Sequence, residues 1–544
     1  MAAQNTTPEL EEKLESSLSS SSSIILPTEA HMGSTQNGPA DLERAVTEKS
    51  HRSNAESPAT RYTTALDWEN DHDPENPENW SFGKKTFHIL YIGLQCFIVT
   101  FGTSVYSPSI PQVARHFDVS IEAATLGITL YTLGLAFGPM VSAPISETFG
   151  RKMVYLILFP ISLLFTLGAG LAKSFGTLLV CRFLAGFIGS GGLAVGAGSN
   201  SDMLPPLKRA PVASVFILCP FLGPALGPLV GGYIAQYKTW EWTQWVLLMM
   251  GAVAVILGFF QKETYKKIIL LKRAKRLSLP PPPNPIAAMS PLQRIKFIFT
   301  VTLARPLVML VTEPIVSFLA IYTAFNFGVL FCFFAAFPLI FQSIYPEIQV
   351  YHFSTGSTGL VYIAIGIGVI SASIIFIIID RLYYVPHARK EIAAGKNERS
   401  LLLPPEARVH AATIGSVLLP IGLFWFAWTA RTDIHWIVPI IATVFFGTGN
   451  LLVFFTAVLY QIDAYGPLMG ASAMAANGIL RYAAGAVFPL FTRQMYRAMG
   501  VGWATTMLGF VTVALLPLPW ILLKYGHKIR GKSRYAEFSK SQGF

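Results

Sequence analysis

From about residue 86 onward, the chain alternates long apolar segments with short polar interruptions. A helix needs roughly 20 predominantly apolar residues to cross the hydrocarbon core of a membrane. Twelve segments approach or exceed that length, at approximately 86–108, 123–144, 153–172, 177–199, 211–235, 243–260, 315–341, 357–379, 410–430, 434–460, 471–491 and 501–523. The pattern therefore predicts an all-α membrane protein with twelve transmembrane helices.

The longest polar interruption divides these segments into two groups of six. Its last part, 291–312, is predicted to form an interfacial helix, because joining it to the next span would make a helix too long for the bilayer. The second span of each half ends in an acid followed by a base, in "ISETFGRK" and "IIDRLYY". Such repeated halves around a central site are typical of transporters. The predicted organisation is a disordered acidic, Ser-rich tail at 1–83, an N-terminal six-helix bundle at 84–260, a basic, Pro-rich linker at 261–312, a pseudo-symmetric C-terminal six-helix bundle at 313–523 and a basic tail at 524–544.

The distribution of Lys and Arg predicts the orientation in the membrane. With the amino terminus in the cytosol, the loops and tail on the cytosolic side hold 26 Lys and Arg, against 6 on the external side. Basic residues concentrate on the cytosolic side of membrane proteins, so both termini are predicted to be cytosolic. The expected location is the plasma membrane, with the vacuolar membrane as the alternative. The basic stretch 262–276 either binds anionic lipid of the inner leaflet or only obeys this charge rule.

Composition excludes most other classes of protein. Only 13% of the residues are charged, about half the share in soluble domains. The tail sequence "GHKIRGKS" has the spelling of a phosphate loop, but that motif works only between a strand and a helix. The histidines are scattered, and the four cysteines fall in four different spans as small packing residues. We therefore expect no enzyme activity, no metal, no ATP or other cofactor and no nucleic-acid partner.

Two arginines, Arg182 and Arg481, lie well inside predicted spans. A charge at that depth is expensive and indicates a functional site by default, although it can also tie helices together through carbonyl groups. No acid lies at mid-membrane; the acids of the spans sit at their cytosolic ends, at Glu147, Asp202, Glu313, Asp380 and Asp463. This asymmetry favours neutral or anionic amphipathic substrates over polycations.

The predicted substrate cavity is aromatic and weakly polar, which suits amphipathic small molecules. Each aromatic side chain could instead face lipid or pack in the core. The candidate residues come from the seventh, tenth and eleventh spans: Phe325, Asn326, Phe327, Phe331, Phe334, Asn450, Phe454, Asn477 and Tyr482.

The fifth span contains "LGPALGPLVGG", with four glycines and two prolines in eleven residues. Gly223, Gly227 and Gly231 are four residues apart and form one stripe, which lets two helix backbones approach closely. Pro224 and Pro228 form a neighbouring stripe, and Gly232 closes the motif. We expect a tight, water-sealing contact between the two halves here.

Several of these motifs resemble the major facilitator superfamily, and within it the fungal drug:proton antiporters with twelve spans. "SETFGRK" is similar to the family's loop between spans 2 and 3, "CRFLAGFIGSGG" to its span 4 motif and "GPALGPLVGG" to the antiporter motif of exporters. The stretches "NPENW", "ETY", "YQIDAYG" and "AANGILRYAAGAVFPLF" resemble the branch of multidrug and polyamine exporters. Thr148, Glu241 and Ala335 depart from the pattern of that branch.

The resemblance implies a monomeric, proton-coupled exporter that works by alternating access. Arg182 takes the arginine position linked to proton coupling, Arg481 joins it as a transport residue, and Glu313 is our candidate proton carrier. The cytosolic latch is expected at Glu147, Gly150, Arg151, Lys152, Asp202, Asp380 and Arg381. An organic-acid or polyamine exporter, an uncoupled facilitator and a receptor that transports nothing stay open as alternatives.

Overall fold

The computed structural model describes residues 67–70, 72–204, 206–281, 304–342, 348–394 and 404–533, and residues 290, 293, 300 and 535. The tail prediction for 1–66 and most of the predicted interfacial helix at 291–312 lie outside this part of the chain.

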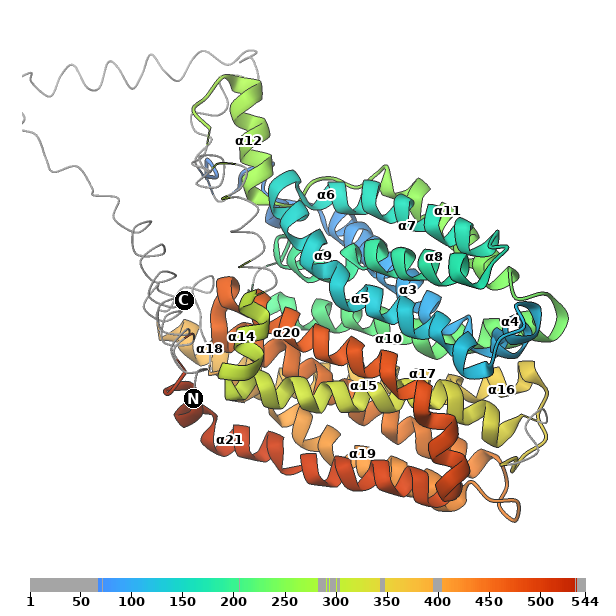
Figure 1. Cartoon of the computed structure of the whole chain (residues 1–544). Coiled ribbons are helices and arrows are strands. Elements are labelled where there is room, and N and C mark those ends of the chain that lie inside the picture. The colour runs from blue at the N-terminus through green and yellow to red at the C-terminus, as the bar shows by residue number, and fades with distance from the viewer. Residues whose placement is uncertain are drawn as a thin grey trace, which may run out of the picture. The chain divides into compact units, whose positions relative to one another are not determined.

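The N-terminal half is a bundle of long apolar helices (Figure 1). Its main helices are α3 (Phe82–Ser104), α5 (Ile121–Phe149), α7 (Phe159–Gly170), α8 (Phe175–Gly189), α9 (Gly191–Ser201), α10 (Pro206–Tyr237) and α11 (Trp242–Gly258). Shorter pieces are η3 (Pro77–Asn79), η4 (Ser107–Ser109), α4 (Ile110–His116), α6 (Arg151–Met153), the π-helical turn η5 (Val154–Leu158) and α12 (Lys266–Leu277), which follows the bundle.

The C-terminal half repeats this design. Its helices are α14 (Arg305–Thr312), α15 (Pro314–Phe341), α16 (Thr355–Val361), α17 (Ile363–Ile379), α18 (Val385–Ala393), α19 (His410–Thr429), α20 (Ile437–Leu515) and α21 (Pro517–Arg530), with the turns η8 (Asp380–Tyr384) and η10 (Pro405–Arg408). Helix α20 is interrupted at Gly466 and Gly500, whose φ values of 66° and 73° are not helical.

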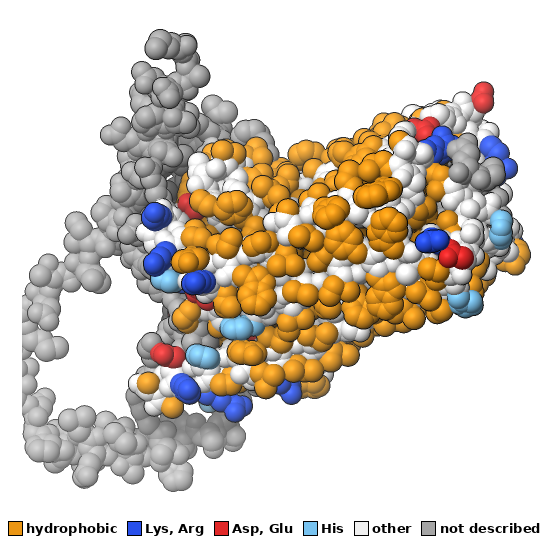
Figure 2. Space-filling model, turned by 90° about the horizontal axis from the view of Figure 1, so that it is seen from below, with side chains coloured by type: hydrophobic (Ala, Val, Ile, Leu, Met, Phe, Trp, Pro, Cys, Tyr) orange, Lys and Arg blue, Asp and Glu red, His pale blue; other side chains and the backbone are white. Residues whose placement is uncertain are grey.

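The predicted twelve-span fold is confirmed. Among the described residues, ten helices are long and apolar enough to cross a membrane, and α11 is a shorter apolar helix. The stretch Met469–Arg530 counts as one of the ten, but the break at Gly500 divides it into the last two predicted spans. Figure 2 shows the outer surface these helices make: a broad hydrophobic band with charged side chains gathered toward its two ends. The protein is therefore an integral, multi-pass membrane protein.

The two halves lie side by side with their helices roughly aligned (Figure 1). Helices α12, α14 and α18 lie at one end of the bundle, which we call the linker end; α4 and the start of α16 lie at the other, which we call the distal end. Helix α10 of the N-terminal half packs against α16 and α17, and α5 packs against α20. These three packed helix pairs form the boundary between the halves.

The glycine and proline motif does not break α10, which continues through it to Tyr237. A Cβ at Gly223 would collide with the backbone of α3, and one at Gly227 with the Ser104 hydroxyl at the end of α3. A Cβ at Gly231 would collide with the carbonyl of Val105 just beyond that helix. The expected contact between halves is therefore wrong for these three glycines, because their stripe faces a helix of the same half. Gly232 alone of the motif's glycines faces the other half, where a Cβ would lie 2.8 Å from the Thr355 carbonyl oxygen.

The predicted tail boundary at residue 83 is also wrong. Asn76 caps η3 by accepting a hydrogen bond from the Glu78 amide, and Asp73 and Asn76 are buried. Residues 67–70 and 72–80 therefore belong to the folded part of the chain, because their acidic side chains pair with basic residues of α12 that a charge count along the chain does not reveal.

Candidate transport site

The predicted latch of the N-terminal half centres on Arg151, at the start of α6. Its Nε lies 3.5 Å from Oδ2 of Asp202, its Nη1 donates to the Ser146 hydroxyl, and its guanidinium lies 4.7 Å from the centre of the Tyr265 ring. Glu147 and Lys152, which flank this cluster in sequence, are exposed and half-buried respectively. The structure thus brings Arg151 and Asp202 together as predicted and leaves Glu147 at the surface.

Glu263 holds the turn between α5 and α6 in place. It was not identified from the sequence as a site residue. Its carboxylate accepts hydrogen bonds from the backbone N–H groups of Arg151, at 2.9 Å, and Lys152, at 3.2 Å. Gly150 has a φ of 102°, and a Cβ there would collide with the Glu263 carboxylate. Only glycine suits both requirements. The "ETY" stretch was the available signal, but nothing in one sequence shows that it folds back onto the α5–α6 turn.

The C-terminal half has a matching cluster around Arg408, a second residue that the sequence did not single out. Its Nη1 donates to Asp380 at 3.2 Å and its Nε to Asp463 at 2.6 Å, and its guanidinium lies 3.8 Å from the Tyr384 ring centre. Burial lowers the pKa of Arg408, but Asp463, Tyr384 and Asp380 outweigh it and raise that pKa above the usual value. Arg381, predicted in the latch, is instead exposed.

Neither cluster bridges the halves in this conformation. The partners of Arg151 just described belong to the N-terminal half, and those of Arg408 to the C-terminal half. Hydrogen bonds between the halves lie instead in the distal part of the bundle. Ser107 donates to the Phe334 carbonyl at 3.0 Å, and the Gly356 amide donates to Gln236 at 2.8 Å.

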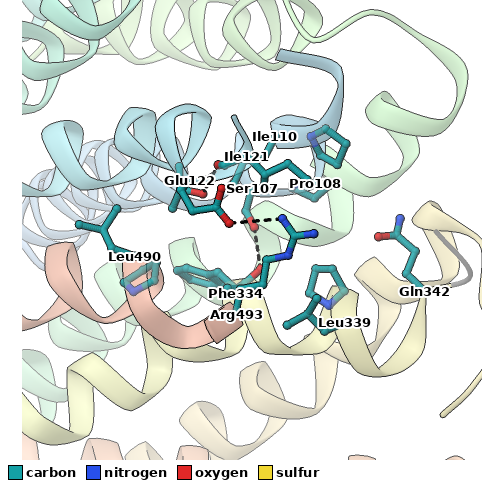
Figure 3. A pocket seen from close by; sticks show the side chains of 15 residues that line it. Ser107, Pro108, Ile110, Ile121, Glu122, Phe334, Leu339, Gln342, Leu490 and Arg493 are labelled. Carbon is teal, nitrogen blue, oxygen red and sulfur yellow. Dashed lines mark hydrogen bonds and ion pairs between the residues drawn. The ribbon is translucent and has the colours of Figure 1, made fainter. Parts of the chain in front are cut away.

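The distal end also holds a small pocket of about 50 Å³ between the halves (Figure 3). Across it, Arg493 Nη1 lies 3.4 Å from Glu122 Oε1, joining α20 to the start of α5. The pocket sits beside the Ser107–Phe334 hydrogen bond, with Gln342 at its rim. These contacts join the two halves at the distal end.

Arg182 is fully buried in the N-terminal half, and its partners are carbonyls and rings. Nε donates to the Gly127 carbonyl at 2.7 Å and Nη2 to the Gly102 carbonyl at 3.0 Å. The guanidinium lies 4.4 Å from the ring centre of Tyr106 and 4.8 Å from that of Tyr131. Arg182 therefore ties α8 to α3 and α5, which is the structural alternative weighed from the sequence.

Arg481 has a different environment, at the boundary between the halves. Its guanidinium lies 4.8 Å from the Phe327 ring centre, 4.7 Å from that of Phe454 and 4.2 Å from that of Tyr482. Phe221 of α10 in the other half contacts both Phe327 and Phe454. Among the described residues, buried Nε of Arg481 has no hydrogen-bond acceptor. We call Arg481 with these four rings the arginine box.

Buried amides accompany the arginine box. Asn477 lies four residues before Arg481, on the same face of the helix, and its buried Nδ2 has no acceptor among the described residues. Asn326 is fully buried next to Phe327, and neither of its side-chain atoms has a partner in that part of the chain. Unpaired polar groups inside a protein are rare and call for a ligand or water. Asn450 lies four residues before Phe454 and is buried as well.

Of the other predicted cavity residues, Phe331 contacts the arginine box through Phe327, with ring centres 4.7 Å apart, whereas Phe334 and Phe325 contact other rings. Phe331 and Phe334 are fully buried and pack in a row of rings along α15, and Phe325 packs against Phe488. They are core residues in this conformation. Glu313, the candidate proton carrier, is buried where α15 begins and accepts a hydrogen bond from the Tyr465 hydroxyl at 2.9 Å.

The described residues contain no disulfide and no side-chain cluster suited to a metal ion. No group of three His, Cys, Asp or Glu side chains there could hold a metal ion. All four cysteines are free; Cys96 and Cys332 are buried, and Cys181 and Cys219 are partly buried.

Two helical halves of membrane spans, with polar groups buried at their boundary, define a membrane transporter. The profile of the Major Facilitator Superfamily matches residues 92–489. The chain belongs to this superfamily, which confirms the predicted resemblance; it is a transporter and not an enzyme.

Similar proteins are fungal. Polyamine transporter 4 of Saccharomyces cerevisiae is 40% identical over 490 residues, covering 86% of this chain and 73% of that protein. Efflux pump FUB11 of Gibberella moniliformis is 41% identical over 475 residues, covering 85% and 76%. Among solved structures, the proton:xylose symporter XylE matches with a TM-score of 0.59 at 14% identity, covering 82% of this chain and 97% of its own. That likeness shows the fold alone.

The pair between Asp202 and Arg151 depends on pH. Burial raises the pKa of Asp202 to about 6, although Arg151 and Thr264 act to lower it and nearby Glu263 raises it further. An unfolded Asp has a pKa of about 3.9. Between about pH 4 and 6 the folded protein therefore binds more protons at Asp202 than the unfolded chain does. The free energy of unfolding falls as the pH rises through this range.

Replacing Asp202 by asparagine should remove this slope. We expect the wild type to lose on the order of 2 kcal/mol of stability across that range relative to Asp202→Asn. Melting temperatures of both proteins, measured from pH 4 to 8 in the same detergent, check this. Parallel curves for the two proteins would show that Asp202 does not titrate there.

Proposed function

We propose that this protein is a proton-coupled exporter, an antiporter of small amphipathic neutral or anionic compounds such as drugs, toxins or secondary metabolites. It works by alternating access, with the linker end in the cytosol of a cell whose plasma membrane holds the protein. The strong bias of Lys and Arg toward the linker end supports this orientation. The efflux pump among its relatives supports export.

The arginine box is the observation that carries the substrate class. A guanidinium deep in a membrane protein needs an anion or strong acceptors nearby, and the described neighbours of Arg481 are three aromatic rings of its own half and the Phe221 ring beyond them. An aromatic or alicyclic body would stack on these rings while a carboxylate or carbonyl oxygen meets Arg481 and Asn477. Because the box joins residues of both halves, a bound substrate would favour one relative position of the halves over another.

The residue that binds and releases the transported proton would be an acid at the linker end. Asp202 suits that role because its pKa of about 6 lies near cytosolic pH, and its protonation would weaken the pair with Arg151. Glu313 is the second candidate, buried and bound by Tyr465. The cycle then draws on the proton gradient, without ATP or a cofactor, in a protein that acts as a monomer.

Polyamine export is the second candidate function, because a relative of 40% identity is named a polyamine transporter. A polyamine needs carboxylates to replace its hydration. Among the described residues, the boundary cluster around Arg481 contains a cation and amides, with no carboxylate contact to the box. This composition favours the first candidate.

Comparative metabolite profiling distinguishes the two functions. Culture medium and cells would be compared with the gene present, with the gene deleted, and with the gene carrying Arg481→Gln or Arg481→Lys. We expect deletion to trap anionic or neutral aromatic compounds inside the cell, Arg481→Gln to lower their export at least 10-fold, and Arg481→Lys to retain part of it. Retention of spermidine and spermine instead, with export insensitive to Arg481→Gln, would favour the polyamine function.

A further inference from the structure

Helix α12 stands at the linker end, beyond the N-terminal bundle (Figure 1). Leu270 and Ala274 are buried on one face of this helix, and Ile268 is buried near its start, although the helix carries a strong positive charge. Its Arg273 is fully buried as well. A buried arginine needs an ionised partner, so the helix must be docked on an acidic surface.

That surface is the ordered segment that precedes α3. Arg273 Nη2 lies 2.8 Å from Asp73 Oδ2, and both side chains are completely buried. Arg273 Nε also meets Glu75 Oε2 at 2.8 Å, while Arg276 and Lys266 reach Glu75 and Asp67 at 2.6 Å each. We call this set of ion pairs the clasp.

The central ion pair of the clasp is held in place by further hydrogen bonds to Asp73. Asp73 accepts backbone hydrogen bonds from Glu69, at 3.1 Å, and Glu75, at 2.9 Å, so its carboxylate is fixed before Arg273 approaches. Burial tends to raise the pKa of Asp73, but the Glu75 amide and Arg273 outweigh it and hold that pKa below its usual value. Breaking a buried pair by removing one partner is strongly unfavourable, because the other charge stays buried.

The residues directly before α12 hold the N-terminal latch. The Glu263 carboxylate binds the amides of Arg151 and Lys152, and the Thr264 hydroxyl lies 3.4 Å from Asp202 Oδ2. The Lys262 amide donates to His88 Nε2 at 3.0 Å, which fixes the same stretch to α3. Residues 262–264 therefore connect the latch to α12, whose Lys266, Arg273 and Arg276 belong to the clasp.

We propose that the clasp is a positioning device for the transport cycle: segment 67–76 holds α12 so that residues 263–265 hold the α5–α6 turn. Asp73 and Arg273 are its central positioning residues, and their effect on transport rests on the proposed function. The clasp also occupies three of the basic side chains in 262–276. Anionic lipid would then meet the remaining exposed ones, such as Lys272 and Lys275.

Hydrogen exchange tests the structural half of this proposal without any cargo. The full-length protein would be compared with Arg273→Gln, Arg273→Lys and the exposed control Lys272→Gln. All would be placed in nanodiscs of phosphatidylcholine with about one-fifth phosphatidylserine, which supplies the anionic charge of a cytoplasmic leaflet. For Arg273→Gln we expect amides of residues 146–153 and 263–270 to exchange about 10-fold faster, while those of 108–122 at the distal end keep their rates. Arg273→Lys should restore part of the protection, and Lys272→Gln should match the wild type.

Transport kinetics test the functional half. With the cargo identified by profiling, Arg273→Gln should lower the maximal rate several-fold and leave KM unchanged, because the arginine box is untouched. Unchanged exchange at 146–153 would overturn the proposal, and so would faster exchange with a wild-type maximal rate. Asp73→Asn provides the same test if Arg273→Gln does not fold. A wild type that moves no cargo, with exchange altered as expected, would count against the proposed function rather than the clasp.

Discussion

Replacing Arg182 by alanine should reduce export to background and also destabilise the protein. The guanidinium supplies two hydrogen bonds to carbonyls of neighbouring helices and fills the space between Tyr106 and Tyr131. Losing these contacts and leaving a cavity should cost about 3 kcal/mol or more. Transport of the profiled cargo and the melting temperature of the purified variant, measured in one detergent, check both effects.

Arg182→Lys separates charge from geometry in the same experiment. Lysine keeps the charge but cannot present two fixed N–H groups to the carbonyls of Gly127 and Gly102. If Arg182 acts through helix packing, Arg182→Lys should be nearly as inactive as Arg182→Ala. Near-normal export by Arg182→Ala would contradict any essential role of this residue, and full activity of Arg182→Lys would favour a purely electrostatic one.

Replacing Gly227 by leucine should destabilise the N-terminal half. A Cβ at this position would collide with the Ser104 hydroxyl and lie 2.8 Å from the Val105 amide nitrogen. Backbone cannot yield as a flexible side chain can, so overpacking should cost at least about 3 kcal/mol. We expect low membrane abundance and a melting temperature reduced by roughly 5–10 °C, and thermal unfolding of the purified variant measures this.

Gly232→Ala is the matched control, since Gly232 belongs to the same motif but faces α16 of the other half. This variant should fold but weaken the contact between the two halves at the distal end. Labelling of a Thr125→Cys probe in the distal pocket, in a background without the native cysteines, should then become faster than with Gly232 intact. A well-folded, fully active Gly227→Leu would contradict the close packing of α10 on α3.

Hydropathy and charge predicted the spans and their grouping because these properties are set by the bilayer and not by distant contacts. The spans at 86–108 and 315–341 match α3 and α15 within a few residues. Arg481 was found by the same reasoning, because a charge inside an apolar segment is visible in one sequence.

The partners of these residues could not be predicted, because they come from distant parts of the chain. Glu263 lies 112 residues from Arg151, and Arg273 lies 200 residues from Asp73. The acids of segment 67–75 were assigned to a polar tail because composition alone does not distinguish a disordered segment from one that is clamped by buried arginine. The glycine stripe was read as a contact between halves for a similar reason: spacing indicates a close helix neighbour but does not identify it.

The most direct test of the central claim is transport by the purified protein in proteoliposomes with an imposed pH gradient. The predicted result is uphill movement of the profiled cargo from the linker side to the distal side, driven by protons that move the opposite way. A proton ionophore should then abolish this accumulation. Cargo that only equilibrates, at a rate independent of the gradient, would contradict the account and indicate an uncoupled facilitator.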